Sequence, residues 1–86
     1  MKKRTARKTV TFTQPFKLLG IEGELPPGTY DVDTDEEMID DLSFVAWRRV
    51  ATTIQVRSAG VSQVHSVDPV DLEASLLRDG GMTVRA

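Results

Sequence analysis

The chain has 86 residues, of which 40% are hydrophobic and 28% charged, with a formal net charge of −2. This length suffices for one domain, and a chain of this size buries only about 60% of the surface that it exposes when unfolded, which argues against a large internal active site. The sequence contains no cysteine, which excludes disulfides, thiolate metal sites and a cysteine nucleophile.

The sequence also bears on the compartment. No stretch approaches the roughly 18 apolar residues that a membrane-spanning helix needs. The basic start, MKKRTARK, is followed by TVTFTQPF rather than by the apolar run of a secretory signal. Because the lack of cysteine also fits a reducing environment, we expect a soluble protein in the cytoplasm.

Residues 1–8 show no apolar periodicity, and we expect them to form a flexible basic tail. Clustered lysines and arginines can neutralise phosphates, so this segment is a candidate nucleic-acid contact. We favour a solvated tail, because the rest of the chain is net acidic. The basic residues in question are Lys2, Lys3, Arg4, Arg7 and Lys8.

The globular part is expected to span residues 9–79 and to begin with a half-buried strand. Pro15 falls on the polar side of this strand and cannot donate to a sheet ladder, which favours an edge position. The glycine- and proline-rich segment 20–28 predicts a loop, followed by a short strand with Tyr30 and Val32 facing inward. The apolar residues that alternate with polar ones in the first strand are Val10, Phe12, Phe16 and Leu18.

The acidic stretch after this second strand has two interpretations. Thr34 and Glu37 match the S/T-x-x-E capping box and predict a short helical turn. Asp31, Asp33 and Asp35 resemble the start of a calcium loop, but the glycine and the bidentate glutamate that such a loop needs at its sixth and twelfth positions are missing. We therefore favour a solvated acidic face over a site for a divalent ion.

Residues 44–57 read as one long strand around which the sheet is organised. The opposite, outer face carries Trp47, Arg49 and Arg57, and tryptophan and arginine are enriched at binding hot spots. These three residues form a candidate binding surface unless Trp47 is covered by the C-terminal helix or by the segment with Met38, Ile39 and Leu42. We favour the covered arrangement, because tryptophan is highly buried on average. The residues predicted to face the core are Phe44, Ala46, Val50, Thr52, Ile54 and Val56.

After a hairpin at residues 58–60, residues 61–67 predict a fourth strand. Their alternation is poor, so this strand either carries a bulge or is exposed on both faces. His65 is the only histidine, and no nucleophile elbow or oxyanion loop accompanies it, so we do not expect catalysis there.

A C-terminal helix is predicted from Pro69 to about Asp79, with Asp68 as its N-cap and Gly80 as its stop. In a helical-wheel projection this helix has two apolar strips. One strip is expected to pack on the sheet, and the other is left for a partner. The first strip comprises Val70, Ala74 and Leu77; the second comprises Leu72 and Leu76, which we include in the candidate binding surface.

Between the two strips lies Glu73, which we expect to reach solvent or to pair with an arginine such as Arg48. Residues 80–86 are expected to be a flexible C-terminal tail, although Val84 is compatible with a short strand.

The segments ELPPGTYDVDTDEE, LSFVAWRRVATTIQV and VDPVDLEASL resemble a group of short uncharacterised bacterial proteins, over most of residues 9–78. The resemblance implies a stand-alone bacterial domain and carries no activity, ligand or site residue.

Together these patterns predict an α+β domain. We expect a three- to four-stranded antiparallel curled sheet or small open barrel, with a short helical turn and a C-terminal helix. The expected function is a non-catalytic binding or assembly module without a cofactor, with a protein partner or a second copy of itself. The alternative is a small nucleic-acid-associated protein that uses the basic N-terminal residues.

Overall fold

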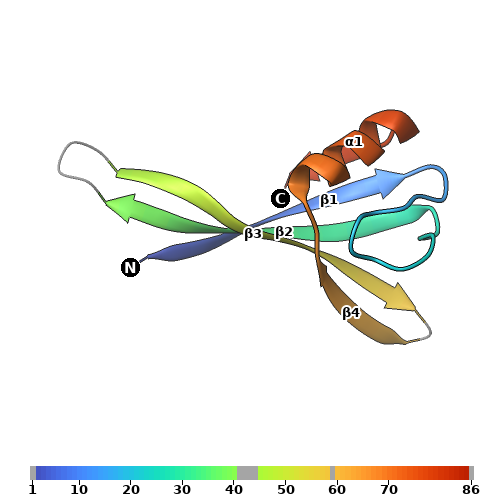
Figure 1. Ribbon diagram of the computed structural model, residues 1–86, viewed down its shortest axis with the longest axis horizontal. Helices are drawn as coiled ribbons and strands as arrows, with labels where there is room; N and C mark the ends of the chain where they lie inside the picture. Colours follow the sequence, from blue (N-terminus) through green and yellow to red (C-terminus); the bar gives the residue numbers. More distant parts are fainter. Residues whose placement is uncertain (1, 41–44, 59, 86) are drawn as a thin grey trace.

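A computed structural model, which describes residues 2–40, 45–58 and 60–85, contains five strands and one helix (Figure 1). The strands form one antiparallel sheet in the order β4-β3-β2-β1-β5. The elements are β1 (Lys3–Phe12), β2 (Gly28–Asp40), β3 (Val45–Ser58), β4 (Val61–Ser66), α1 (Pro69–Asp79) and β5 (Met82–Arg85).

The prediction of an α+β domain with an antiparallel sheet and a C-terminal helix is confirmed. The predicted number of strands and the predicted shape are wrong, because the sheet has five strands and is open rather than curled or closed. The additional strand, β5, comes from residues that were expected to be a C-terminal tail. It pairs with β1, where Val84 lies opposite Thr9.

Two further predictions are wrong for a shared reason. Residues 3–8 belong to β1 instead of a flexible tail, and residues 34–40 continue β2 instead of forming a helical turn. The pairing of β1 with β2 places Lys3 opposite Glu37 and Arg4 opposite Glu36. Opposite charges that face each other across two strands favour the extended pairing, so the acids support a strand rather than a helix start.

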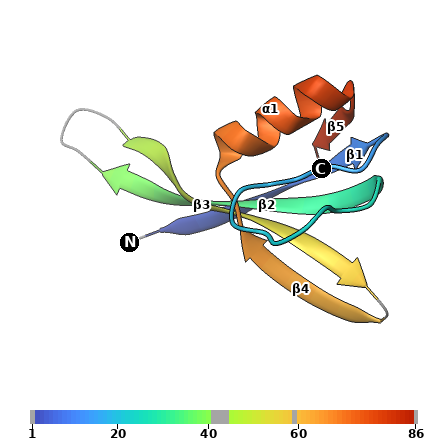
Figure 2. The same ribbon diagram turned by 45° about the vertical axis from the view of Figure 1, so that its right-hand side comes forward.

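The hydrophobic core lies at one end of the sheet, between the strands, α1 and the loop of residues 13–27 (Figure 2). Phe12 and Phe16 stack with ring centroids 3.5 Å apart, and Tyr30 meets Phe16 edge-on at 5.3 Å. From α1, Leu72 and Leu76 complete this core. Its other members are Val10, Leu18, Leu25, Val32, Ile54 and Val67.

Local signals set the bounds of α1, as predicted from the sequence. The Asp68 side chain accepts a hydrogen bond from the Val70 N–H at 2.8 Å. Gly80 ends the helix in the left-handed conformation, with φ of 72°, which glycine adopts without steric cost. The loop holds α1 in place, because the Leu19 N–H donates to the Asp71 carboxylate at 2.9 Å.

Beyond the core, three strands continue side by side as a ribbon, which we define as residues 3–7, 33–40 and 45–51 (Figure 1). The ribbon makes the molecule elongated, with extents of 47 × 27 × 23 Å and a radius of gyration of 14.6 Å. A compact domain of this length would have a radius of about 12 Å. Much of the sheet therefore lies away from the core.

A β-bulge at the base of the ribbon changes which residues of β3 face the helix side. Asp35 pairs with Ala51, whereas Glu36 pairs with Arg49, so Val50 is the extra residue. A bulge shifts the alternation by one position. Thr52 and Ile54 are buried as predicted, but Val50 is 47% exposed. The prediction that the even positions share one face along the whole strand is wrong. Phe44, at the start of that series, lies outside the described residues.

Candidate binding surfaces

On the helix side of the ribbon, three residues from three strands form one cluster. Arg4 of β1 donates a hydrogen bond from Nε to the Glu36 carboxylate of β2 at 2.9 Å. The same guanidinium lies 4.1 Å from the ring centroid of Trp47 on β3, which is within the range of a cation–π interaction. Trp47 is half-buried, and its partial cover comes from Arg4 and not from α1.

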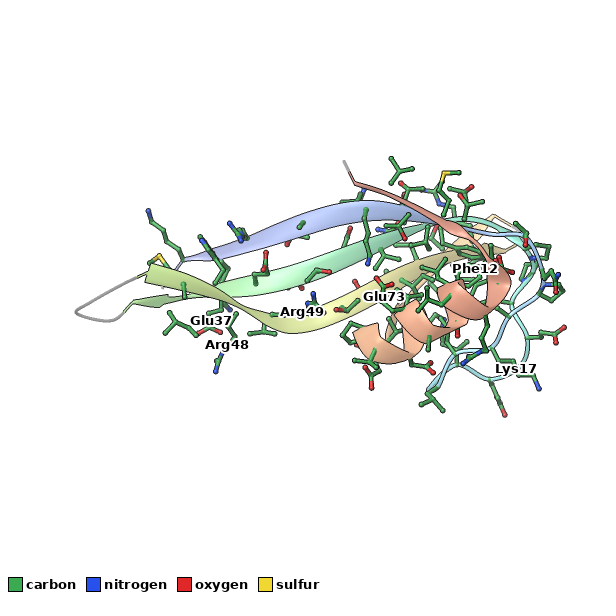
Figure 3. The ribbon with its side chains drawn as sticks, turned by 90° about the horizontal axis from the view of Figure 1, so that it is seen from above. Phe12, Lys17, Glu37, Arg48, Arg49 and Glu73 are labelled. Atoms are coloured by element: carbon green, nitrogen blue, oxygen red, sulfur yellow. The ribbon has the colours of Figure 1, made fainter. Side chains whose placement is uncertain are left out.

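Arg49 lies on the same face of β3 as Trp47, because the two residues are two positions apart, and the bulge at Val50 makes this the helix side. It borders a groove of about 470 Å³ on the ribbon. Figure 3 labels Arg49 on the ribbon, with Arg48 and Glu37 further from the core end of the sheet. The groove is lined by Thr5, Ala6, Arg7, Lys8, Thr34, Glu36 and Arg49.

The opposite face of the ribbon carries rows of charged and hydroxyl side chains that pair across strands. Arg7 donates to the Asp33 carboxylate from Nε at 2.7 Å and from Nη2 at 3.1 Å. This hydrogen bond holds the pKa of Asp33 below its ordinary value and raises that of Arg7. The Thr5 hydroxyl donates to Asp35 at 2.7 Å. The charged groups of this face are thus held in fixed positions.

The predicted surface of Trp47, Arg49, Arg57, Leu72 and Leu76 does not form one patch. Arg57 lies on the face opposite Trp47 and Arg49, because the bulge separates them. Leu72 and Leu76 are 1% and 5% exposed and belong to the core. The prediction that they bind a partner is therefore wrong. The other strip of α1 is the exposed one, with Val70 at 75% and Leu77 at 81%.

Most of the candidate nucleic-acid contacts lie in ion pairs. Arg4 pairs with Glu36, and Arg7 pairs with Asp33. The Lys8 ammonium lies 3.5 Å from the Glu73 carboxylate. The side chains of Lys2 and Lys3 are exposed at the end of the ribbon. Four of the five basic residues therefore lie in β1, which pairs with the acidic part of β2, and Lys2 immediately precedes this strand.

Glu73 is exposed to solvent, which confirms one of the two expectations, and its ion-pair partner is Lys8 rather than the expected Arg48. The Arg48 guanidinium instead lies 3.8 Å from the Glu37 carboxylate. Lys8 and Glu73 lie far apart in the sequence, so nothing in the spacing along the chain identifies their pair. Glu37 and Arg48 lie opposite each other on the neighbouring strands β2 and β3.

The three aspartates of the acidic stretch lie on one face of β2 at alternate positions. Asp33 is engaged by Arg7 and Asp35 by Thr5, while Asp31 lies opposite Thr9. Across residues 2–40, 45–58 and 60–85, no group of three or more histidine, aspartate or glutamate side chains is placed to hold a metal ion. Leu42, the twelfth position of the calcium-loop comparison, lies outside these residues.

His65 lies on β4, where its Nε2 is hydrogen-bonded to the Gln63 side chain at 3.2 Å. Gln63 is two residues away on the same face of the strand. The His65 ring is thus engaged by a neutral amide side chain of its own strand.

Sequence reasoning left one surface undecided, the exposed strand β4, and did not include it among the candidate binding surfaces. Val61 and Val64 are 58% and 62% exposed, although they lie on opposite faces of the strand. The poor alternation of residues 61–67 was the signal, because a strand without a buried face has no reason to alternate. The structure thus favours the exposed strand over the bulge, since β4 pairs with β3 without a shift in register.

No family model matches the chain, and neither a curated protein nor a solved structure is similar to it. The resemblance to short bacterial proteins therefore stays a prediction. In the described part of the chain, no helix has the length and apolar character that crossing a membrane requires.

Proposed function

We propose that the protein is a non-catalytic binding or assembly module, and that the ribbon is its contact surface for another protein. The observation that carries this proposal is that three strands extend past the core while neither of their faces is covered by another described element (Figures 1 and 2). Sheets are normally stabilised by packing at least one face against another layer. A partner would supply that missing layer.

The side chains of the ribbon suit a protein partner. Trp47 provides a half-buried aromatic group beside two arginines, Arg4 and Arg49. Such aromatic and arginine residues contribute most to binding energy in many interfaces, while polar neighbours exclude water around them. The ion pairs of the opposite face hold charges of both signs, which favours a partner of mixed charge over a polyanion.

The nucleic-acid alternative has less support. Phosphate binding releases counterions when free basic side chains approach the backbone, but Arg4, Arg7 and Lys8 already face carboxylates. A nucleic-acid-binding protein would bind mixed DNA or RNA with an affinity that falls steeply with salt. We expect no such binding in a salt-titrated assay, and a steep salt dependence that disappears on substituting Lys2 and Lys3 would favour the alternative.

The proposal is tested by site-specific photo-crosslinking in cells of the source organism. A photoreactive residue at Ala6, which lines the groove, is compared with one at Glu22, an exposed position in the loop of residues 13–27. We expect a discrete adduct from Ala6 that Glu22 does not give. An excess of wild-type protein without the photoreactive residue should reduce the amount of this adduct. The same excess of the Arg49→Glu variant should reduce it much less.

If excess wild-type protein and excess Arg49→Glu variant reduced the amount of adduct equally, Arg49 would take no part in binding. Equal adducts from Ala6 and Glu22, or none from Ala6, would contradict a specific contact surface on the ribbon. Circular dichroism of Arg49→Glu controls for folding.

A further inference from the structure

β4 forms one edge of the sheet, and its outer side has no neighbouring strand among the residues that the structure describes (Figure 1). Five of its six residues are exposed, and His65 is half-buried. A free edge strand presents backbone groups that can pair with another chain. β4 therefore offers a template for strand addition that is separate from the ribbon.

The register of β4 on β3 shows which backbone groups face outward. The Val67 N–H donates to the Thr52 carbonyl at 2.9 Å, so positions 67 and 52 form a hydrogen-bonded pair. Such pairs alternate along an antiparallel ladder. It follows that 65, 63 and 61 direct their N–H and C=O groups toward β3. Ser62, Val64 and Ser66 direct theirs toward the free edge.

β4 lacks the features that usually protect an edge. Its sequence, VSQVHS, contains no proline, lysine, arginine, aspartate or glutamate, whereas each of the other four strands carries at least one charged residue. Edge strands are commonly protected by charges, by proline or by a bulge. Their absence at β4 is expected if the edge is normally paired.

We propose that β4 pairs antiparallel with β4 of a second copy of this chain, with Val64 opposite the partner's Val64. The proposal rests on the assembly function proposed above but uses a different surface. The three outward positions are symmetric about Val64, so a two-fold axis there places Ser62 opposite the partner's Ser66. Each of these pairs can exchange two backbone hydrogen bonds, and the two five-stranded sheets become one.

The absence of charge on β4 is what favours a second copy as the occupant. In a two-fold interface each residue meets the same patch of the partner, so a charged strand would place like charges near one another. β4 is the strand that avoids this. On the outer face the two Val64 side chains, each 62% exposed in the single chain, would cover one another.

The other edge of the sheet is a poorer partner for β4. β5 has four residues against six in β4, and it includes Arg85. Pairing β4 with β5 of another copy would also be head-to-tail, which generates open chains rather than a closed dimer. At the Ser66 end, a Cβ atom added to loop residue Gly20 would lie 3.9 Å from the Ser66 carbonyl oxygen, so the loop follows directly and the paired segment ends at Ser66.

The test uses two opposite charges at the same position. We expect wild-type protein to form dimers in analytical ultracentrifugation, and Val64→Lys and Val64→Glu each to raise the dimer dissociation constant by at least about tenfold, because like charges then face one another. An equimolar mixture of the two variants should recover dimers that contain one copy of each. Recovery by mixing requires that position 64 of one copy meets position 64 of the other.

Two further variants complete the design. Val64→Pro removes an N–H that faces outward and not toward β3, so it should abolish the dimer while circular dichroism stays unchanged. Val84→Lys places a charge on the same face at the other edge, where Val84 is 55% exposed, and should leave the dimer intact.

Three results would overturn the proposal: a wild-type protein that stays monomeric at high concentration, a dimer that survives Val64→Lys, or a Val64→Lys and Val64→Glu mixture that stays monomeric. Loss of assembly in Val84→Lys would assign the contact to β5 instead. Because Ala6 lies on the ribbon, its crosslink in the Val64→Lys background reports on the proposed function independently of β4.

Discussion

The carboxylate of Asp79 accepts hydrogen bonds from the backbone N–H of Thr13 at 2.7 Å and from the Thr13 hydroxyl at 3.0 Å. It accepts another from the Gln14 N–H at 2.9 Å. The last residue of α1 thus binds the start of the loop that follows β1. The Thr13 N–H is the main reason that the pKa of Asp79 lies below its ordinary value of 3.8, although desolvation opposes the effect.

We predict that Asp79→Asn destabilises the protein at neutral pH and that the difference from wild type narrows in acid. The pKa of Asp79 is lower in the folded state than in the unfolded state, so its contribution is present above the ordinary value of 3.8. It is lost as the pH falls through the folded-state pKa. The measurement is the urea midpoint of both proteins from pH 7 down to pH 3.

Glu22→Gln, a substitution of an exposed loop carboxylate, is the control for the general effect of removing a negative charge. A gap between Asp79→Asn and wild type that is the same at pH 3 and at pH 7 would show that the carboxylate charge does not stabilise the junction.

The two apolar strips of α1 predict opposite responses to the same substitution. Leu72→Ala should lower the free energy of unfolding by about 2–5 kcal/mol, because it leaves a cavity in the core. Leu77→Ala should change it by no more than about 0.5 kcal/mol, as is usual for an exposed site. Both leucines lie in the same helix, at 1% and 81% exposure, so the change in helix propensity on substitution by alanine is similar. Chemical denaturation of both variants measures the difference, and similar losses would contradict the orientation of α1.

The helix was predictable because its determinants are local. Asp68, Pro69 and Gly80 act within a few residues of the helix ends, where the capping geometry is decided. Which of its two apolar strips faces the core was not predictable, because both strips satisfy helical periodicity equally. It depends on where β1 and the loop of residues 13–27 place Phe12 and Leu18, and these contacts span most of the chain.

The ribbon was not predicted from the sequence for a similar reason, because the contacts that stabilise it are distant in sequence. Residues 3–8 read as a tail because their charges lack apolar alternation, yet the strand is stabilised by partners such as Asp33 and Glu36, which are distant in sequence. The bulge at Val50 leaves no local signature and moves Arg49 and Trp47 to the other face. A candidate surface assigned by counting alternate residues therefore fails at the first bulge.

Thr52 offers a substitution that should stabilise the protein. This residue is 4% exposed, and its hydroxyl has no hydrogen-bond partner among the residues that the structure describes. An unsatisfied buried polar group costs about 1–3 kcal/mol. Thr52→Val replaces the hydroxyl with a methyl of similar size, and we expect the free energy of unfolding to rise by about 1 kcal/mol.

The matched control for this substitution is Thr53→Val, on the opposite and half-exposed face of the same strand, with an expected change within about 0.5 kcal/mol. Equal changes in urea midpoint for the two variants would show that the buried hydroxyl carries no penalty.

Gly81 joins α1 to β5 at a point where β1 and α1 leave no room for a side chain. A Cβ atom there would overlap the Thr11 carbonyl oxygen and would lie 3.0 Å from Leu76 Cδ2. Gly81→Ala should therefore cost about 3 kcal/mol, because backbone and core must both shift. Gly23 is the control, since its φ of +79° is unfavourable for alanine but nothing lies within 4 Å of the added methyl; we expect about 1 kcal/mol there. If thermal unfolding gave the same loss for both, the close approach of Gly81 to β1 would be wrong, and with it the docking of β5 on that strand.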